Sequence, residues 1–284
     1  MKKILATLSI LGLLITAGPA FAIPNFSSAT LDTPGTTKTL TLPPSAENST
    51  VISLGSGVDP ATGKVVEGLA IIHRKVNPSH KPNHNPPSGS SDTCYTYISN
   101  GAKWKVSEPW VVNPVNIDGL NETTVFNLFS GAVSKWEDAT DGDVTNGSGV
   151  DVLGTGSTTS DILVADTSSP DNQNEAYFAD ISNQGVIAVT IVWGIFGGPP
   201  FGRELVEWDQ IYDDVSFDWS ADVSGVSGKM DSDNIITHEI GHSFGMGDLY
   251  NTCTEETMYG YGDFAETKKR DLNSGDITGI NKLY

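Results

Sequence analysis

Hydrophobic and polar positions along the chain recur with two different periods, and these periods predict its helices and strands. Apolar residues recur every three or four positions across 125–136, which predicts an amphipathic helix. Short runs rich in β-branched and aromatic residues predict strands. These runs lie at 65–72, 103–112, 161–165, 186–193 and 203–212.

Capping residues predict two further helices toward the C-terminus. Asp231 or Ser232 can cap a helix that covers 238–242, and Ser274 can cap a last helix that ends the chain. One helix, several strands, a second helix and a last helix then follow one another within 94–284, which is long enough for one complete core. This order predicts the α+β class.

Composition divides the chain ahead of residue 94 into three segments. Residues 1–22 hold a basic start, an apolar run and the small residues of Ala20-Phe21-Ala22, which predict a secretory signal peptide. A retained anchor is the alternative, but the apolar run is short for a membrane span. Residues 23–72 are rich in Thr, Ser and Pro and are interpreted as a pro-segment-like region. Residues 73–93, rich in Pro, His and Ser, have the composition of a solvated linker to the domain at 94–284. We therefore expect a secreted protein, extracellular or periplasmic, with no membrane attachment once the signal is cut.

The net charge of the chain argues against two classes of binding partner. The chain has 35 acidic and 16 basic residues and a formal net charge of −19, so its surface repels nucleic acid and anionic membranes. The acidic loop 138–143 could hold calcium, but it lacks EF-hand spacing, and a solvated acidic surface is the favoured interpretation. No internal repeat is apparent, and we expect a monomer.

The chain contains two cysteines, Cys94 and Cys253. In an exported protein the default for two cysteines is one disulfide. The alternative is that Cys94 is a free thiol, which would leave Cys253 unpaired in an oxidising compartment.

The most specific motif of the chain is H-E-x-x-H-x-x-G-x-x-D at 238–248. On a helix, His238 and His242 lie on one face and can bind one zinc ion, while Glu239 can reach a water molecule on the metal without binding the metal. Gly245 can adopt the positive φ that ends the helix and returns the chain, so that Asp248 supplies a third ligand. A fourth position left open for water is the mark of a catalytic zinc site.

These residues resemble the metzincin metallopeptidases and, among them, the matrixins. The stretch Met258-Tyr259-Gly260-Tyr261 resembles the Met-turn of that family, and 269–284 resembles its closing helix. Upstream, 125–136 resembles the first helix of the family, and 187–193 resembles its substrate-binding edge strand. The secreted prokaryotic matrixin-like proteases are the nearest in character. The resemblance implies an α+β zincin fold, with a mixed twisted β-sheet, an active-site helix, a Met-turn and a C-terminal helix.

Three departures from the matrixin pattern stand out. Asp248 replaces the usual third histidine, a variant found in a minority of metzincins. Gly260 replaces the proline that usually follows the Met-turn, which puts the shape of the S1′ wall in doubt. Cys94 lacks the Pro-Arg-Cys-Gly surroundings of the matrixin cysteine switch. The gluzincin alternative requires a distant glutamate as third ligand and does not expect Gly245 or Asp248.

The resemblance implies a zinc-dependent endopeptidase that hydrolyses polypeptides. Glu239 would be the general base toward a metal-activated water, and one catalytic zinc ion would be held by His238, His242 and Asp248. Met258 would form an apolar floor beneath the metal, and Tyr259 or Tyr261 would stabilise the oxyanion or line the S1′ pocket. The strand at 187–193 would bind an extended peptide by strand addition; the equally weighted alternative is an ordinary buried strand.

Two other classes of function compete with this one. A secreted binding protein could use a zincin scaffold without turnover, but such proteins are expected to lose the glutamate base, and Glu239 is present. A calcium-dependent adhesin would show repeats or extra binding modules, which are not apparent here.

Overall fold

The computed structural model describes residues 39–43, 46, 49–76, 93–250 and 252–284. The predicted signal peptide and most of the predicted linker lie outside the described residues. The strands of the main sheet are β1 Thr39–Leu40, β2 Val51–Val58, β3 Val65–Lys75, β4 Glu108–Asn113, β5 Leu153–Thr158, β6 Asn174–Ile181, β7 Val186–Ile195, β8 Glu204–Asp213 and β11 Tyr261–Gly262. The helices are α1 Glu122–Asp138, α2 Ser232–Ser243 and α3 Ser274–Leu283.

Within the described residues these nine strands form one mixed sheet, in the order β11-β3-β7-β8-β6-β4-β5. In addition, β2 pairs with β3 and β1 pairs with β6. Strands β5, β4, β6 and β8 run parallel to one another, whereas β7 is antiparallel to both β8 and β3. A separate two-stranded pair, β9 Trp219–Ser220 and β10 Met230–Asp231, leads into α2.

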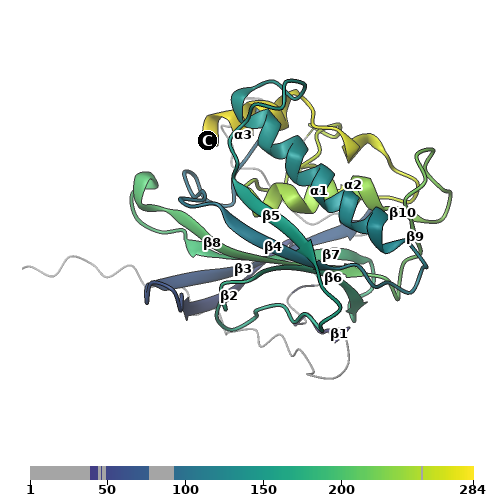
Figure 1. Ribbon diagram of the computed structural model, residues 1–284, viewed down its shortest axis with the longest axis horizontal. Helices are drawn as coiled ribbons and strands as arrows, with labels where there is room; N and C mark the ends of the chain where they lie inside the picture. The colour runs from purple at the N-terminus through teal and green to yellow at the C-terminus, as the bar shows by residue number, and fades with distance from the viewer. Residues whose placement is uncertain (1–38, 44–45, 47–48, 77–92, 251) are drawn as a thin grey trace, which may run out of the picture.

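The helices lie on one face of the sheet, as Figure 1 shows. Between them and the sheet is the larger apolar core, where α1 contributes Phe129 and Trp136 and α2 contributes Ile235 and Ile240. A second apolar core covers the opposite face of the sheet. Its N-terminal members come from β1, the residues after it, β2 and β3: Leu40, Leu42, Ala46, Ile52, Leu54, Val66, Ala70 and Ile72. The region predicted to be a pro-segment therefore supplies strands to the sheet and one side of a core.

Local pattern predicted the helices well and the strands unevenly. Helix α1 contains the predicted 125–136, and the predicted strand 203–212 is β8 displaced by one residue. The strand predicted at 103–112 is shorter, because only Glu108–Asn113 is a strand. The strand predicted at 161–165 is wrong: this segment is irregular, and although Leu163 and Ala165 pack on the second core, Ile162 and Val164 are exposed. Strands β5 and β6 were missed, since β5 is rich in Gly, Ser and Thr and β6 buries polar residues.

The predicted edge strand also needs correction. β7 is paired on both sides, with β8 along one edge and with β3 along the other. Its residues are buried almost throughout because the sheet continues past it and both faces are covered. Its second neighbour comes from the N-terminal region, a pairing between segments more than a hundred residues apart.

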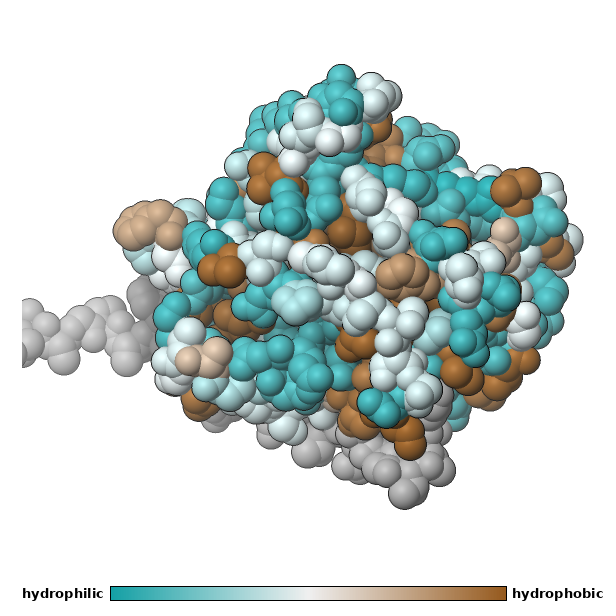
Figure 2. All heavy atoms as spheres, viewed as in Figure 1, coloured by the Kyte–Doolittle hydropathy of each residue, from teal (hydrophilic) through white to brown (hydrophobic). Residues whose placement is uncertain are grey.

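The two cysteines form a disulfide, with 5.5 Å between the Cα atoms of Cys94 and Cys253. The bridge joins the start of the predicted domain to the segment between Asp248 and Met258. None of the described helices is long and apolar enough to cross a membrane. On the face shown in Figure 2, apolar side chains are interspersed with polar ones.

Candidate metal centre

Helix α2 begins and ends as its sequence predicts. Asp231 is the N-cap residue, and its Oδ1 accepts a hydrogen bond of 2.9 Å from the amide of Asn234. Beyond the helix, Gly245 has φ of +97°, and a Cβ there would lie 2.9 Å from the carbonyl oxygen of Ala102. Only glycine accommodates both constraints, so this residue sets the turn that brings the following chain back toward the helix.

The turn brings Asp248 against the two histidines of α2. Asp248 Oδ1 lies 3.2 Å from His238 Nε2 and 3.4 Å from His242 Nε2. The side chains of the histidines are 0% exposed and that of Asp248 is 4% exposed. The structure thus brings together the three residues predicted as metal ligands.

The hydrogen bonds around the imidazoles show what this cluster can hold. His238 Nδ1 lies 2.6 Å from the carbonyl oxygen of Thr257, and His242 Nδ1 lies 2.9 Å from that of Met246. A carbonyl oxygen can only accept, so each Nδ1 carries the proton and each Nε2 of the neutral ring presents a lone pair. Two lone pairs and a carboxylate oxygen then face one another with no hydrogen-bond partner among the described residues. Buried acceptors in this arrangement require a cation, and two imidazoles with one carboxylate suit zinc.

Tyr250, which sequence reasoning missed, orients the third candidate ligand. Its hydroxyl donates a 2.8 Å hydrogen bond to Asp248 Oδ2, which leaves Oδ1 directed at the histidines. Tyr261 packs its ring on Tyr250 at 5.2 Å between centroids, whereas Tyr259 faces the ammonium group of Lys268. Of the three tyrosines, Tyr250 is therefore the one bonded to a candidate ligand.

The Met-turn connects the candidate centre to the closing helix. Met258 is fully buried, and a Cβ on Gly241 of α2 would overlap its sulfur atom. Asp276, near the start of α3, accepts from the amides of Thr257 at 2.7 Å and of Met258 at 3.2 Å. Because the Thr257 carbonyl orients His238, Asp276 fixes the ring through this turn. The capping box of Asn273 and Asp276 holds the carboxylate in place.

Glu239 lies beside the three candidate ligands, and its two oxygens accept from different side chains. The hydroxyl of Thr190 on β7 donates to Oε2 at 2.5 Å, and His73 Nδ1 lies 2.7 Å from Oε1. Burial raises the pKa of Glu239 to about 7, with the nearby imidazole of His242 and the Thr190 hydrogen bond opposing the rise. A carboxyl group with a pKa in this range can both accept and return a proton at neutral pH.

His73 corrects the prediction of a solvated linker that begins at residue 73. It belongs to β3, is fully buried, and packs its ring on that of His238 at 3.9 Å between centroids. Its Nε2 lies 3.2 Å from the ammonium of Lys269, which also donates to the carbonyls of Tyr259 and Tyr261. An ammonium only donates, so Nε2 of His73 accepts and Nδ1 carries the proton given to Glu239. His80 and His84, the other two histidines of that segment, lie outside the described residues.

Burial and charge act differently on the two candidate histidine ligands. Burial lowers the pKa of His238 to about 4, helped by the charge of Lys269. Burial also disfavours the charged form of His242, but the carboxylate of Asp248 outweighs it and raises the pKa. Without a metal, a proton entering the cluster therefore binds His242 first.

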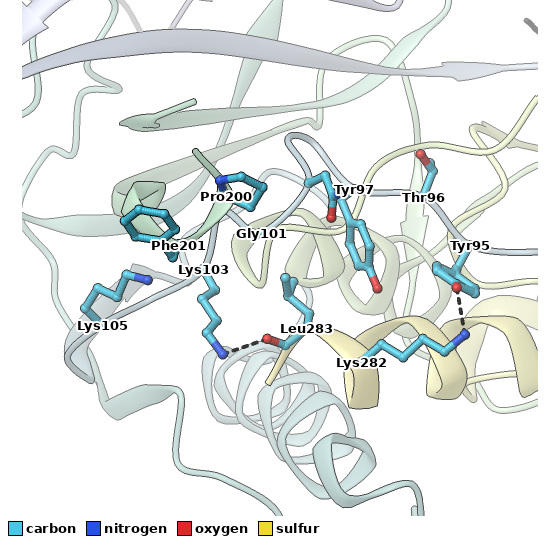
Figure 3. A pocket seen from close by; sticks show the side chains of 11 residues that line it. Tyr95, Thr96, Tyr97, Gly101, Lys103, Lys105, Pro200, Phe201, Lys282 and Leu283 are labelled. Atoms are coloured by element: carbon cyan, nitrogen blue, oxygen red, sulfur yellow. Dashed lines mark hydrogen bonds between the residues drawn. The ribbon is translucent and has the colours of Figure 1, made fainter. Parts of the chain in front are cut away.

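A separate cavity of about 610 Å³ lies away from this cluster and is drawn in Figure 3. Its lining includes the lysines Lys103, Lys105 and Lys282, and none of the candidate ligands. Lys103 donates to the carbonyl of Leu283 and Lys282 to the hydroxyl of Tyr95 (Figure 3). The candidate metal centre is thus buried and is not part of this cavity.

The loop 138–143 is not among the described sites where three possible ligand side chains converge. Its Asp141 accepts instead from Asn146 and Ser148, which follow the loop. A convergent acidic group lies elsewhere, formed by Asp166, Glu207 and Asp209.

The comparison with protein families gives a match over the region that contains α1, α2 and α3. A family model described as Matrixin matches residues 104–284. A search of curated proteins finds no match.

Proposed function

The chain belongs to the matrixin family of zinc metallopeptidases, and from this premise we propose that it is a secreted zinc-dependent endopeptidase in which Glu239 is the general base. One observation carries the proposal: three buried ligand atoms without hydrogen-bond partners converge beside a carboxyl group that can exchange protons at neutral pH. A scaffold that only binds its partners has no need of such a carboxyl group at this place.

In the proposed mechanism His238, His242 and Asp248 would hold the metal, and zinc when bound would supply a Lewis acid for water and for the peptide carbonyl. Glu239 takes a proton from the attacking water and passes it to the departing amine. The Thr190 hydroxyl holds Oε2 of Glu239, so that Oε1, the oxygen that faces His73, is the one assigned to proton exchange. Thr257, Met246 and Tyr250 keep the three ligands oriented before any substrate arrives.

The domain limits and the compartment are part of the proposal. We infer that residues 1–22 direct export, that 23–72 form a pro-segment-like region, and that 94–284 are the catalytic domain. The disulfide supports export, because such bonds persist in oxidising compartments. Polypeptide is the proposed substrate, since family membership implies peptidase chemistry.

Digestion of casein by the purified full-length chain, with and without a zinc chelator, tests this function. We expect cleavage that stops when the metal is removed and returns when zinc is added back. Glu239→Gln, treated identically, is the matched control, because it should retain zinc without cleavage. Cleavage that is unaffected by the chelator, or equal in the variant, would contradict the proposed chemistry.

A further inference from the structure

Strand β3 is paired on both sides, with β7 along one side and with β2 and then β11 along the other. Along one side it is antiparallel to β7, from the pair Glu67 and Gly194 to the pair Arg74 and Val186. Along the other side its end is parallel to β11, where Arg74 and Lys75 lie opposite Tyr261 and Gly262. The amide of Val76 continues this ladder and donates to the carbonyl of Gly262 at 2.8 Å. One strand from the N-terminal region thus connects the sheet to the segment that follows the Met-turn.

The side chains of β3 alternate between the two faces of the sheet, and His73 points toward α2. Ala70 and Ile72 belong to the second core on the far face, whereas Ile71 belongs to the core beneath the helices. His73 therefore lies on the helix side, where it donates to Glu239 and covers the ring of His238.

This arrangement closes the candidate centre. With His73 in place, both oxygens of Glu239 accept hydrogen bonds from protein donors. The side chains of His73, His238, Glu239 and His242 are all 0% exposed. A polypeptide cannot reach a cluster without exposed surface, and a Glu239 held by two donors has lost the oxygen that would accept a proton from water.

We propose that β3 occupies the substrate position of the enzyme, so that the chain is autoinhibited while β3 is paired with β7. The proposal rests on the proposed function and concerns the regulation of the same site. An extended substrate would replace β3, antiparallel to β7 and parallel to β11, because these two strands already pair with a strand backbone there. Withdrawal of His73 then frees Oε1 of Glu239 for water and exposes the edge of β7.

Contacts of β3 on the far face of the sheet stabilise the closed state, in which His73 covers the candidate metal centre. Residues of β3 on the far face are buried against the second core, so the inhibitory strand is anchored by apolar contacts as well as by ladder hydrogen bonds. At Gly68 the strand packs directly on the ring of Trp193, where a Cβ would lie 2.6 Å from a ring carbon. A larger side chain at this position must push β3 away from β7, which offers a way to loosen the strand without touching the metal centre.

Steady-state kinetics of the intact chain separate inhibition from a supporting role of His73. If β3 competes with substrate, the fraction of open molecules limits apparent affinity, so loosening β3 lowers KM and leaves kcat unchanged. His73→Ala removes a charge-assisted hydrogen bond that stabilises the closed state. We therefore expect KM for a fluorogenic peptide to fall about tenfold or more in His73→Ala, and to fall also in Gly68→Val. Glu67→Gln, at an exposed position of the same strand, is the matched control and should leave KM unchanged.

Two results would contradict autoinhibition. If His73 instead positions Glu239 for catalysis, His73→Ala lowers kcat and leaves KM as it was, and autoinhibition is wrong. Hydrogen exchange gives a second measurement that does not depend on turnover: in Glu239→Gln, a saturating peptide substrate should increase exchange of the amides at 65–75. Unchanged protection there would also overturn the proposal.

Failure of this inference is distinguishable from failure of the proposed function. A chain that binds zinc and cleaves casein, with KM unaffected in both loosening variants, keeps its function and loses its autoinhibition. If zinc-loaded wild type, His73→Ala and Gly68→Val are all folded and none cleaves any peptide, both the proposed endopeptidase and the control of its activity are rejected.

Discussion

Two groups of buried polar side chains lie on opposite faces of the sheet, and they differ in how their charges are balanced. On the helix side, His238, His242 and Asp248 combine two imidazoles with one carboxylate. On the far side, the acidic group of Asp166, Glu207 and Asp209 has carboxyl groups alone. Strand alternation separates the two groups, because Glu207 and Asp209 of β8 point to the same face as Ile211 of the second core.

The pKa values of the two groups move in opposite directions. The imidazoles hold the pKa of Asp248 well below its ordinary value, although burial alone would raise it. Burial raises the pKa of Glu207 to about 9 and that of Asp166 to about 6, and neighbouring carboxyl groups add to both shifts. The acidic group therefore keeps protons, whereas the helix-side group keeps its carboxylate charged and its Nε2 atoms free. Two imidazoles with a carboxylate suit a metal ion, whereas three carboxyl groups with no basic partner among the described residues favour shared protons.

Of the substitutions that test this difference, removal of Asp248 should have the largest effect on zinc affinity and activity. Asp248→Ala leaves two ligands, so we expect zinc affinity to fall by more than the 10–100-fold that loss of an outer-shell partner costs, and cleavage to be lost with the metal. Zinc per chain, measured by mass spectrometry after dialysis, checks the result. Asp248→His should restore a three-ligand site and is the matched control. Wild-type zinc affinity in the alanine variant would remove Asp248 from the ligand set.

Glu239→Gln should leave the metal in place and affect the chemistry alone. The amide cannot accept a proton from water, so kcat should fall by about 10²–10⁴-fold, the usual contribution of a general base. Zinc content and peptide cleavage are measured on the same sample. Cleavage within a few-fold of wild type would assign the base role to another group.

Acidification should release zinc, because protonated imidazoles cannot bind it. The first proton of the metal-free cluster is expected at His242, whose pKa is raised by Asp248 against the effect of burial, whereas burial lowers that of His238 to about 4. Zinc occupancy should therefore fall in parallel with activity as pH decreases through the histidine range. An inactive enzyme that still holds all of its zinc would show that a different group controls the pH dependence.

A substitution in the acidic group should have the smallest effect. Its dependence on pH should also be opposite, because this group stabilises the folded protein at acid pH, where the metal centre loses zinc. The folded-state pKa of Glu207 lies above its unfolded value, so the folded protein binds more protons, and stability from this group is present at acid pH and lost as pH rises toward 9. Glu207→Gln should flatten that decline by no more than about 1.4 kcal/mol per pH unit, the limit for one proton. Urea unfolding between pH 5 and 9 measures the slope. The exposed Glu67→Gln is the control, and a slope in Glu207→Gln equal to that of wild type would show that Glu207 holds no extra proton.

Local sequence was sufficient for the parts of the site that lie close together along the chain. The helical spacing places His238, Glu239 and His242, and one glycine at 245 is enough to turn Asp248 back to them. These relations depend on helix geometry and on one backbone angle, both of which are fixed within a dozen residues. The disulfide was accessible for a different reason, since two cysteines allow one pairing.

The tertiary structure alone decided which distant residues complete the site. Thr190 and Asp276, which are distant in sequence, hold groups of the site through hydrogen bonds, as does Tyr250 two residues after Asp248, and nothing in their local sequence marks them. Even the third candidate ligand depends on Tyr250 for the direction of its free oxygen.

The sequence by itself determined a helix that carries candidate metal ligands of the matrixin type, and the tertiary structure decided what covers that helix. The segment at 65–72 read correctly as a strand, but its period of two does not specify a neighbour, and pairing with β7 depends on register across more than a hundred residues. His73 was interpreted as solvated because the segment that it begins, 73–93, is rich in proline and serine. Its neighbours in space are Glu239, His238 and Lys269, and only the folded sheet brings them together.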